Sequence, residues 1–120
     1  MKIAITTRGG NAKELVDTRF GRAKCILIYD DKSSSWQSFD NQVNLNAAQG
    51  AGIQTAQHIV DLGADVVVTG NCGPKAFRVL SAGEIAVYSC TSVTAEEALQ
   101  LFLKNELKQL TDANVEEHWV

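Results

Sequence analysis

A strand, a helix and a second strand follow one another in the second half of the sequence, and this unit constrains the fold most. Residues 64–69 (ADVVVT) are a short apolar run rich in β-branched residues, which is typical of a strand buried on both faces. Residues 74–82 have a helical pattern, and residues 84–90 (EIAVYSC) indicate another strand. Strands joined by a helix pair in parallel through a right-handed crossover. We therefore expect parallel neighbours with the helix on one face of the sheet.

Three further strands are expected before this unit. Residues 2–7 (KIAITT) and 25–30 (CILIYD) are apolar runs, and residues 35–40 (SWQSFD) alternate in polarity. The turn-forming residues 31–34 separate the last two runs, which predicts an antiparallel hairpin. Residues 8–23 mix glycine with charge and are expected to form a loop of functional length.

Two more helices complete the predicted order. Apolar residues recur at helical spacing between Ile53 and Val60, and Gly63 is placed to end that helix. Thr94 and Glu97 form a capping box that opens the last helix. The order βββαβαβα predicts an α/β domain with a central mixed sheet and helices on both faces. We expect one domain over residues 1–110 and an acidic, flexible tail over residues 111–120.

Length and composition limit the class of protein. A chain of 120 residues suits one domain with one core, and 45% hydrophobic with 21% charged residues excludes a disordered chain. The apolar run at the N-terminus is too short for a signal peptide or a membrane span. Three cysteines, an odd number, suit a reducing compartment. A cytoplasmic protein with no membrane partner is therefore expected.

Positive charge is concentrated near the N-terminus. Residues 1–24 contain six Lys or Arg and two acidic residues, whereas the whole chain has a net charge of −3. No basic run is long enough for a nucleic-acid tail, and the acidic remainder would repel a phosphate backbone. The basic segment therefore favours a small anion as its partner and not a nucleic acid.

The three cysteines are expected at one edge of the sheet. Cys72 follows the strand at residues 64–69, Cys90 ends the strand at residues 84–90, and Cys25 begins a strand that would run the other way. Ligands of open α/β sheets bind outside the carboxyl ends of the parallel strands. Cys72 and Cys90 could be close to each other, and the alternative role of a small core residue applies to Cys25 and Cys90 more than to Cys72.

Two glycine-rich helix starts could hold an anion. Gly73 and Pro74 open one helix just after Cys72, and free N–H groups there should lower a thiol pKa and attract anions. Gly50 and Gly52 stand at the other start, where backbone amides could approach a ligand closely. His118, near the end of the chain, is a candidate swinging metal ligand.

The sequence resembles the dinitrogenase iron-molybdenum cofactor biosynthesis family, which includes NifX and the carboxy-terminal domain of NifB. The matching motifs are spread in order over nearly the whole chain: RFGRA at residues 19–23, GAG at 50–52, GNCGPKA at 70–76, GEI at 83–85 and TAEEA at 94–98. The cysteine at position 72 departs from the family, whose members commonly have a residue without a thiol there.

The resemblance implies a three-layer, ribonuclease-H-like fold. Its five-stranded mixed sheet has the strand order 3-2-1-4-5, with strand 2 antiparallel. The resemblance also implies a non-enzymatic protein that binds or carries an anionic metal-sulfur cluster or its precursor. The cluster would be of the iron-sulfur, iron-molybdenum or molybdenum-copper sulfide type. A cofactor-assembly or acceptor protein would be its partner.

These arguments together give two sets of candidate residues. Basic side chains and backbone amides suit a polyanionic cluster, and thiolate or imidazole would ligate its metal. The candidates for cofactor binding are Arg8, Arg19, Arg22, Gly50, Gly52, Asn71, Gly73 and Lys75, and the candidates for metal ligation are Cys72, Cys90 and His118.

Two other functions stay open at the level of sequence. Cys72 and Cys90 could form a switchable pair in a redox-responsive regulatory or interaction module. A ribonuclease-H-like hydrolase is a remote alternative, because two-metal hydrolysis needs convergent carboxylates. Only Asp30, Asp40 and Asp65 stand at strand margins, and the first strand has no acidic residue.

Overall fold

The strand-helix-strand unit is present as expected. The computed structural model describes residues 1–41 and 50–113. Strand β4 (Val66–Thr69) pairs in parallel with β5 (Ala86–Ser89), and helix α3 (Pro74–Ala82) connects them. Pro74 is suited to the first turn of α3, because its fixed φ fits a helix. Its lack of an N–H group costs nothing there, since an N–H in the first turn has no intrahelical acceptor.

One mixed sheet organises the described residues, with the strand order β3-β2-β1-β4-β5-β6. Strand β1 (Lys2–Thr7) lies at the centre, antiparallel to β2 (Cys25–Asp30) and parallel to β4. Strand β3 (Ser35–Asp40) pairs with β2 as the predicted hairpin. The predicted order of the first five strands and the reversed direction of the second are therefore confirmed.

The predicted number of strands is wrong, because the sheet has a sixth. Strand β6 (Lys108–Leu110) pairs antiparallel with β5 and places Leu110 opposite Val87. Its three residues are too few to give an alternation in the sequence. Partly buried Leu110 packs on the core, which explains why the chain returns along the sheet edge. The predicted domain end at residue 110 coincides with the end of β6 and stays a prediction.

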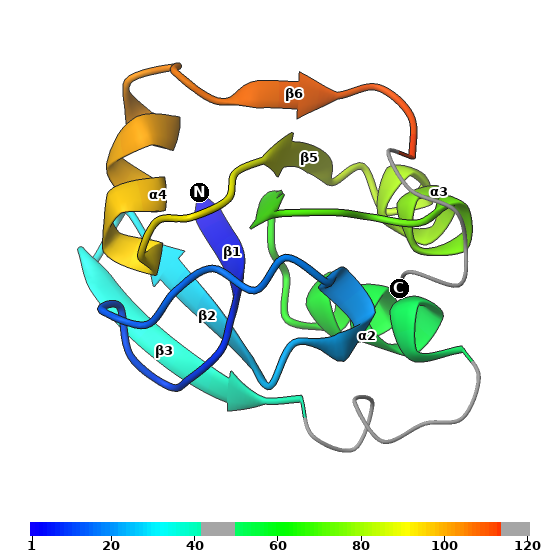
Figure 1. Ribbon diagram of the computed structural model, residues 1–120, viewed down its shortest axis with the longest axis horizontal. Helices are drawn as coiled ribbons and strands as arrows, with labels where there is room; N and C mark the ends of the chain where they lie inside the picture. Colours follow the sequence, from blue (N-terminus) through cyan, green and yellow to red (C-terminus); the bar gives the residue numbers. More distant parts are fainter. Residues whose placement is uncertain (42–49, 114–120) are drawn as a thin grey trace.

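Helices cover both faces of the sheet (Figure 1). Helices α2 (Ala51–Asp61) and α3 contribute Ala56, Ile59 and Leu80 to one core cluster. Helix α4 (Ala95–Leu103) contributes Ala98 and Leu99 to a second cluster. The β-strands supply alternate residues to these two clusters, since successive side chains of a strand point to opposite faces. The mixed α/β architecture is confirmed, whereas the ribonuclease-H-like assignment stays a prediction.

The capping box predicted before α4 is formed. The Glu97 backbone N–H donates to the Thr94 hydroxyl at 3.2 Å, and the Thr94 N–H donates to the Glu97 carboxylate at 2.9 Å. Hydrogen bonds from the Thr94 backbone and side chain to the Glu97 carboxyl group lower its pKa. The cap fixes the start of α4 at Ala95, after the loop that follows the end of β5 at Ser89.

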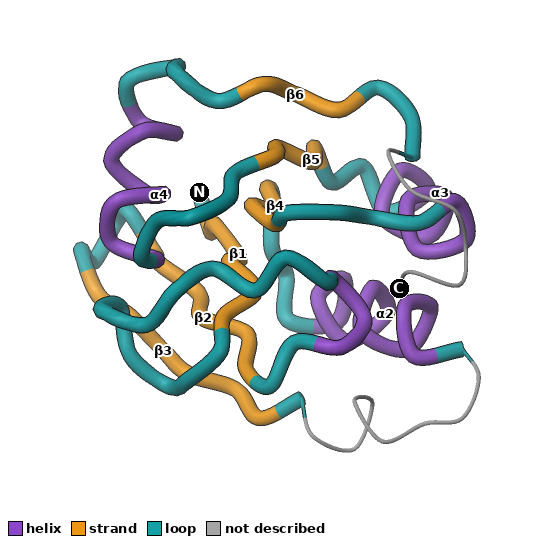
Figure 2. Tube along the Cα trace, viewed as in Figure 1, coloured by secondary structure: helices purple, strands orange, loops and turns teal. Residues whose placement is uncertain are grey.

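The register places several chain segments at one edge of the sheet, which we call the rim. Thr7 at the end of β1 lies opposite Cys25 at the start of β2, and Thr69 at the end of β4 lies beside Ser89 at the end of β5. The long segment between β1 and β2 passes across this rim, as the tube in Figure 2 shows. It includes the short 3-10 helix η1 (Phe20–Arg22). The rim therefore has the position of the ligand-binding edge of an open α/β sheet.

Candidate functional site

The segment between β1 and β2 is held to the rim by backbone hydrogen bonds. The Asp17 N–H donates to the Thr6 carbonyl at 2.8 Å, and the Phe20 N–H donates to the Asn71 carbonyl at 3.2 Å. The Phe20 side chain is fully buried in the core. The predicted functional loop is thus an ordered segment, and the side chains next to these anchors have fixed positions.

The backbone of Thr18 lies so close to Gly70, the residue after β4, that position 70 requires glycine. A Cβ atom built on Gly70 would lie 2.6 Å from Cα of Thr18 and 3.0 Å from its carbonyl oxygen. Backbone atoms cannot rotate away as a flexible side chain can, so only glycine fits here. The absent side chain lets residues 17–19 lie directly against the end of β4.

Buried polar groups hold the end of η1 against α2. The Asn41 side chain is almost fully buried and donates to the Ala23 carbonyl at 2.8 Å. Its amide group also donates to the Thr55 hydroxyl on α2 at 3.2 Å. Because buried polar groups need such partners, these hydrogen bonds fix the chain between η1 and β2 relative to α2.

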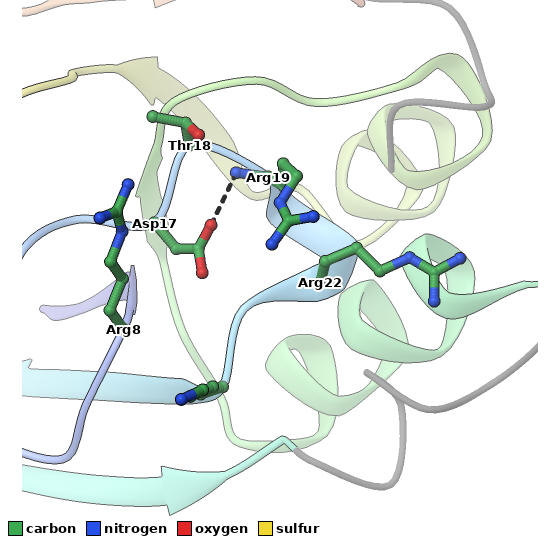
Figure 3. Close-up of a pocket in the computed structure, with 6 residues that line it drawn as sticks. Arg8, Asp17, Thr18, Arg19 and Arg22 are labelled. Atoms are coloured by element: carbon green, nitrogen blue, oxygen red, sulfur yellow. Dashed lines mark hydrogen bonds between the residues drawn. The ribbon is translucent and has the colours of Figure 1, made fainter.

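A pocket of about 210 Å³ lies where this segment crosses the rim. Its lining residues are Arg8, Asp17, Thr18, Arg19, Arg22 and Lys24. Figure 3 shows Arg8 on one side of Asp17 and Arg19 on the other, whereas the Arg22 side chain extends from η1 away from Asp17. Of the described residues, four basic ones and one acidic one line the pocket, so their net positive charge favours an anionic ligand.

Three of the predicted cofactor-binding residues are brought together in this pocket. Arg8 follows β1, whereas Arg19 and Arg22 flank and end η1. The sequence reasoning missed two lining residues that matter for charge, Asp17 and Lys24. Lys24 could have been found from its place in the basic segment. No sequence pattern singles out Asp17 as a site residue, because one acidic residue among basic ones usually serves only to balance charge.

The remaining predicted cofactor-binding residues are not among those that line the pocket: Gly50, Gly52, Asn71, Gly73 and Lys75. Gly50 caps α2 in the left-handed conformation, with φ 74°, and Gly52 is buried in the first turn. Asn71 lies beside Arg19 through a parallel backbone bridge. Gly73 is the buried N-cap of α3, and Lys75 is exposed on its first turn. Their roles in binding stay predictions.

The expectation of a lowered thiol pKa at Cys72 is wrong. Cys72 lies next to the α3 N-cap, but its side chain is fully buried in the core cluster shared by α2 and α3. Burial removes the thiolate from water and raises the pKa of Cys72 to about 12. Its thiol contacts the Gly73 carbonyl oxygen at 3.7 Å. Desolvation therefore outweighs the helix N-terminus at this position.

The expected proximity of Cys72 and Cys90 is also wrong. Cys90 packs in the other core cluster, with Ala95 and Leu99 of α4, on the opposite face of the sheet. Burial, with the nearby Glu97 carboxylate, raises the pKa of the Cys90 thiol. Because the two thiols pack in different core clusters, this placement argues against the switchable pair of the redox alternative. Cys25 is half-exposed, and its pKa is raised chiefly by burial.

A conventional metal centre is absent from the described residues. They contain no group of three or more His, Cys, Asp or Glu side chains that could hold a metal ion. His118, the third predicted ligand, lies outside the described residues.

The carboxylates named for a hydrolase do not converge. Asp40 ends β3 at the rim, opposite Cys25. Asp30 and Asp65 stand at the opposite edge, where Asp65 accepts a hydrogen bond from the Lys2 N–H at 2.8 Å. Two-metal hydrolysis needs its carboxylates on one pair of metal ions, and this arrangement cannot supply them.

Comparison with known families decides the assignment. The model of the dinitrogenase iron-molybdenum cofactor family matches residues 1–105. The chain belongs to this family. The resemblance seen in its motifs is confirmed, and the rim pocket is therefore a feature of a member of the dinitrogenase iron-molybdenum cofactor family.

Similar proteins agree with this membership. The apo orange protein of Desulfovibrio gigas is 36% identical, with a TM-score of 0.92 over 95% of this chain and 96% of its own. A candidate NifB protein from Thermotoga is 30% identical, with a TM-score of 0.84 over 96% and 97% of the two chains. The uncharacterised protein MJ0580 of Methanocaldococcus jannaschii is 26% identical over 91% of each chain.

No helix in the described part of this family member is both long and apolar enough to cross a membrane.

Proposed function

We propose that this protein binds and carries a small anionic metal-sulfur cluster, or a precursor of one, as cargo of metallocofactor assembly. The observation behind the proposal is that four basic residues, Arg8, Arg19, Arg22 and Lys24, line one pocket in which Asp17 is the single carboxylate among the described residues. Guanidinium and ammonium groups donate several hydrogen bonds to anions, and these bonds are stronger than neutral ones. The protein has a binding role and no catalytic one.

The chemistry of the lining residues suits non-covalent binding. Within the part of the chain that the structure describes, no thiol or imidazole group lines the pocket. Cys72 is buried with a raised pKa, so little of the thiolate needed for metal ligation exists at neutral pH. The pocket therefore fits a cluster held through its anionic surface. Ligation by Cys72, Cys90 or His118 is not required for this function.

The comparisons support the class of cargo. The family takes its description from the iron-molybdenum cofactor of dinitrogenase, and a similar Thermotoga protein is a candidate NifB. We extend this to iron-sulfur, iron-molybdenum and molybdenum-copper sulfide clusters, which share a compact polyanionic surface. A cofactor-assembly or acceptor protein is the partner that such a carrier needs.

Titration with tetrathiomolybdate without oxygen tests the proposal. This anion carries the soft sulfide edges of the proposed cargo, and its binding can be followed by its absorption. We expect the Arg19→Gln, Arg22→Gln double variant to bind it at least about ten-fold more weakly, because two charge-assisted contacts are lost. Arg78→Gln is the matched control, since Arg78 is an exposed arginine of α3 outside the pocket lining.

The control separates a pocket effect from a general charge effect. Native affinity in Arg78→Gln together with weak binding in the double variant supports the pocket. Equal losses in both variants, or no binding by the native chain, contradict the proposal. Thermal unfolding of each variant checks that the double substitution leaves the fold intact.

A further inference from the structure

A buried carboxylate lies in the wall of the cationic pocket, and binding of an anion does not explain it. The Asp17 side chain is only 6% exposed and lines the pocket. Its Oδ1 atom accepts a hydrogen bond from the Arg19 N–H at 3.0 Å. Its Oδ2 atom has no hydrogen-bond or ion-pair partner within residues 1–41 and 50–113. In Figure 3 the carboxylate is directed into the space between Arg8 and Arg19.

The backbone prevents this carboxylate from moving out of the pocket. The Asp17 N–H donates to the Thr6 carbonyl at 2.8 Å, and the Thr6 hydroxyl donates to the Asp17 carbonyl at 3.2 Å. The Thr6 and Thr69 hydroxyls are themselves hydrogen-bonded at 2.7 Å. The Asp17 N–H and carbonyl are thus both tied to Thr6 of β1, whose hydroxyl is in turn bonded to Thr69 of β4. A bound ligand must accommodate Asp17 where it lies.

The free oxygen sets a chemical condition on that ligand. A carboxylate is an acceptor only, so it repels the bare oxygen or sulfur of a fully deprotonated anion. The Oδ2 atom opens onto the pocket, since no described side-chain oxygen is both buried and unpartnered. A ligand that fills the pocket removes solvent from this oxygen, which is then satisfied only if the ligand donates a hydrogen bond to it. The four cations favour negative charge, and Asp17 adds the requirement for one donor.

We propose that the pocket selects anions that carry a proton. Such an anion donates an O–H or S–H group to Asp17 Oδ2, while its deprotonated edges face the basic side chains. Asp17 is then the specificity-determining residue of the site. This inference rests on the proposed function and specifies the protonation state of its ligand.

Hydrogen phosphate and sulfate are the matched probes. At about pH 8 both are doubly charged tetrahedral oxyanions, and they differ chiefly in the proton that hydrogen phosphate retains. Calorimetric titration in the presence of a chelator should show that the native protein prefers hydrogen phosphate by about ten-fold or more, because only that ion satisfies Asp17.

Asp17→Asn tests the residue with little change in shape. The asparagine carbonyl can still accept from the Arg19 N–H, and its amide group can donate to a bare anion. We expect the ratio of the two affinities to fall to about one, and binding of tetrathiomolybdate, which has no proton to donate, to strengthen. Asp61→Asn removes one negative charge from the exposed end of α2 and should leave the ratio unchanged.

The outcomes separate this inference from the proposed function. Tetrathiomolybdate binding with no preference for hydrogen phosphate over sulfate, or with no phosphate binding, overturns proton selection alone. A preference that persists in Asp17→Asn overturns it as well. Phosphate binding that requires added magnesium also overturns it, since Asp17 would then hold a cation. Failure of tetrathiomolybdate to bind the native protein contradicts the proposed function itself, whatever the two oxyanions do.

Discussion

Burial of the Cys72 thiol couples the stability of the protein to alkaline pH. The pKa of this thiol rises from 9.0 to about 12 because the folded core excludes water. Between these values the folded state keeps a proton that the unfolded state loses. Stability is therefore unaffected below about pH 9 and falls as pH rises toward 12, by at most about 1.4 kcal/mol per pH unit.

Replacing Cys72 by alanine should flatten this pH dependence. We expect the free energy of unfolding to fall less steeply between about pH 8 and pH 10 in Cys72→Ala than in the native chain, because the variant has no thiol to ionise there. Urea unfolding at each pH measures the slope. Cys25→Ala is the control, since Cys25 is half-exposed. Parallel curves for Cys72→Ala and the native chain would contradict the assignment.

Gly70 should be intolerant of any side chain. Gly70→Ala places a methyl group against the backbone of Thr18, and overpacking of this kind costs about 2 kcal/mol. Anion binding should weaken with it, because residues 17–19 must move. Gly10→Ala is the control, since its Cβ would meet only the Ser38 hydroxyl at 3.2 Å. Urea unfolding and tetrathiomolybdate titration measure both effects, and native stability in Gly70→Ala would refute the close approach.

Sequence reasoning found part of the pocket at the level of residues. Arg8, Arg19 and Arg22 share one basic loop, so their convergence could be predicted from charge and chain order. The place of Asp17 depends on hydrogen bonds to Thr6, and through it to Thr69, which is distant in the sequence. No local pattern encodes such a contact. The burial of Cys72 could not be predicted for the same reason, because the residues that cover it come from two helices.

At the scale of elements, β6 closes one edge of the sheet. The segment of residues 108–110 covers β5, which would otherwise present unpaired backbone groups. A chain that ends at residue 107 should be about 2 kcal/mol less stable than one that ends at residue 110, since Leu110 loses its packing on the core. Equilibrium unfolding of the two truncated chains measures the difference.

The longer chain also tests the predicted domain boundary. Full stability in the chain ending at residue 110 agrees with a domain that needs nothing beyond β6. If removal of residues 108–110 leaves stability unchanged, β6 contributes no packing energy and its pairing with β5 is incidental.

The other elements could be predicted because their signals are local. Apolar runs, turn residues and a capping box each act within a few residues, and the crossover rule then orders the strands. The first and last residues of the strands could be predicted less accurately than the presence of the strands. Strand β4 begins at Val66 and not at residue 64, because Asp65 uses its backbone and side chain to hydrogen-bond Lys2.

At the scale of the molecule, charge is divided between a basic first segment and an acidic remainder. Residues 1–24 hold six of the eleven Lys and Arg residues, in a chain of net charge −3. Attraction to the pocket therefore opposes a general repulsion of anions. We expect affinity for tetrathiomolybdate to fall several-fold between about 0.05 and 0.5 M sodium chloride, because salt screens the exposed part of the attraction.

The control for this prediction is the same titration in the Arg19→Gln, Arg22→Gln variant, in which two charged side chains of the pocket are replaced by uncharged ones. Its salt dependence should be shallower than that of the native chain, since fewer pocket charges remain to be screened. Equal salt dependence in the two proteins would place the electrostatic attraction elsewhere on the surface.

The anchoring of the loop by β4 has a consequence for when the site can form during folding. The pocket side chains all precede β2, so synthesis completes them early. Their support at Gly70 and Asn71 arrives only after α2, and pairing of β1 with β4 is a non-local step that closes a long loop. We expect an incomplete chain to have the charges without the geometry. Capture of cargo is then restricted to molecules that have finished folding.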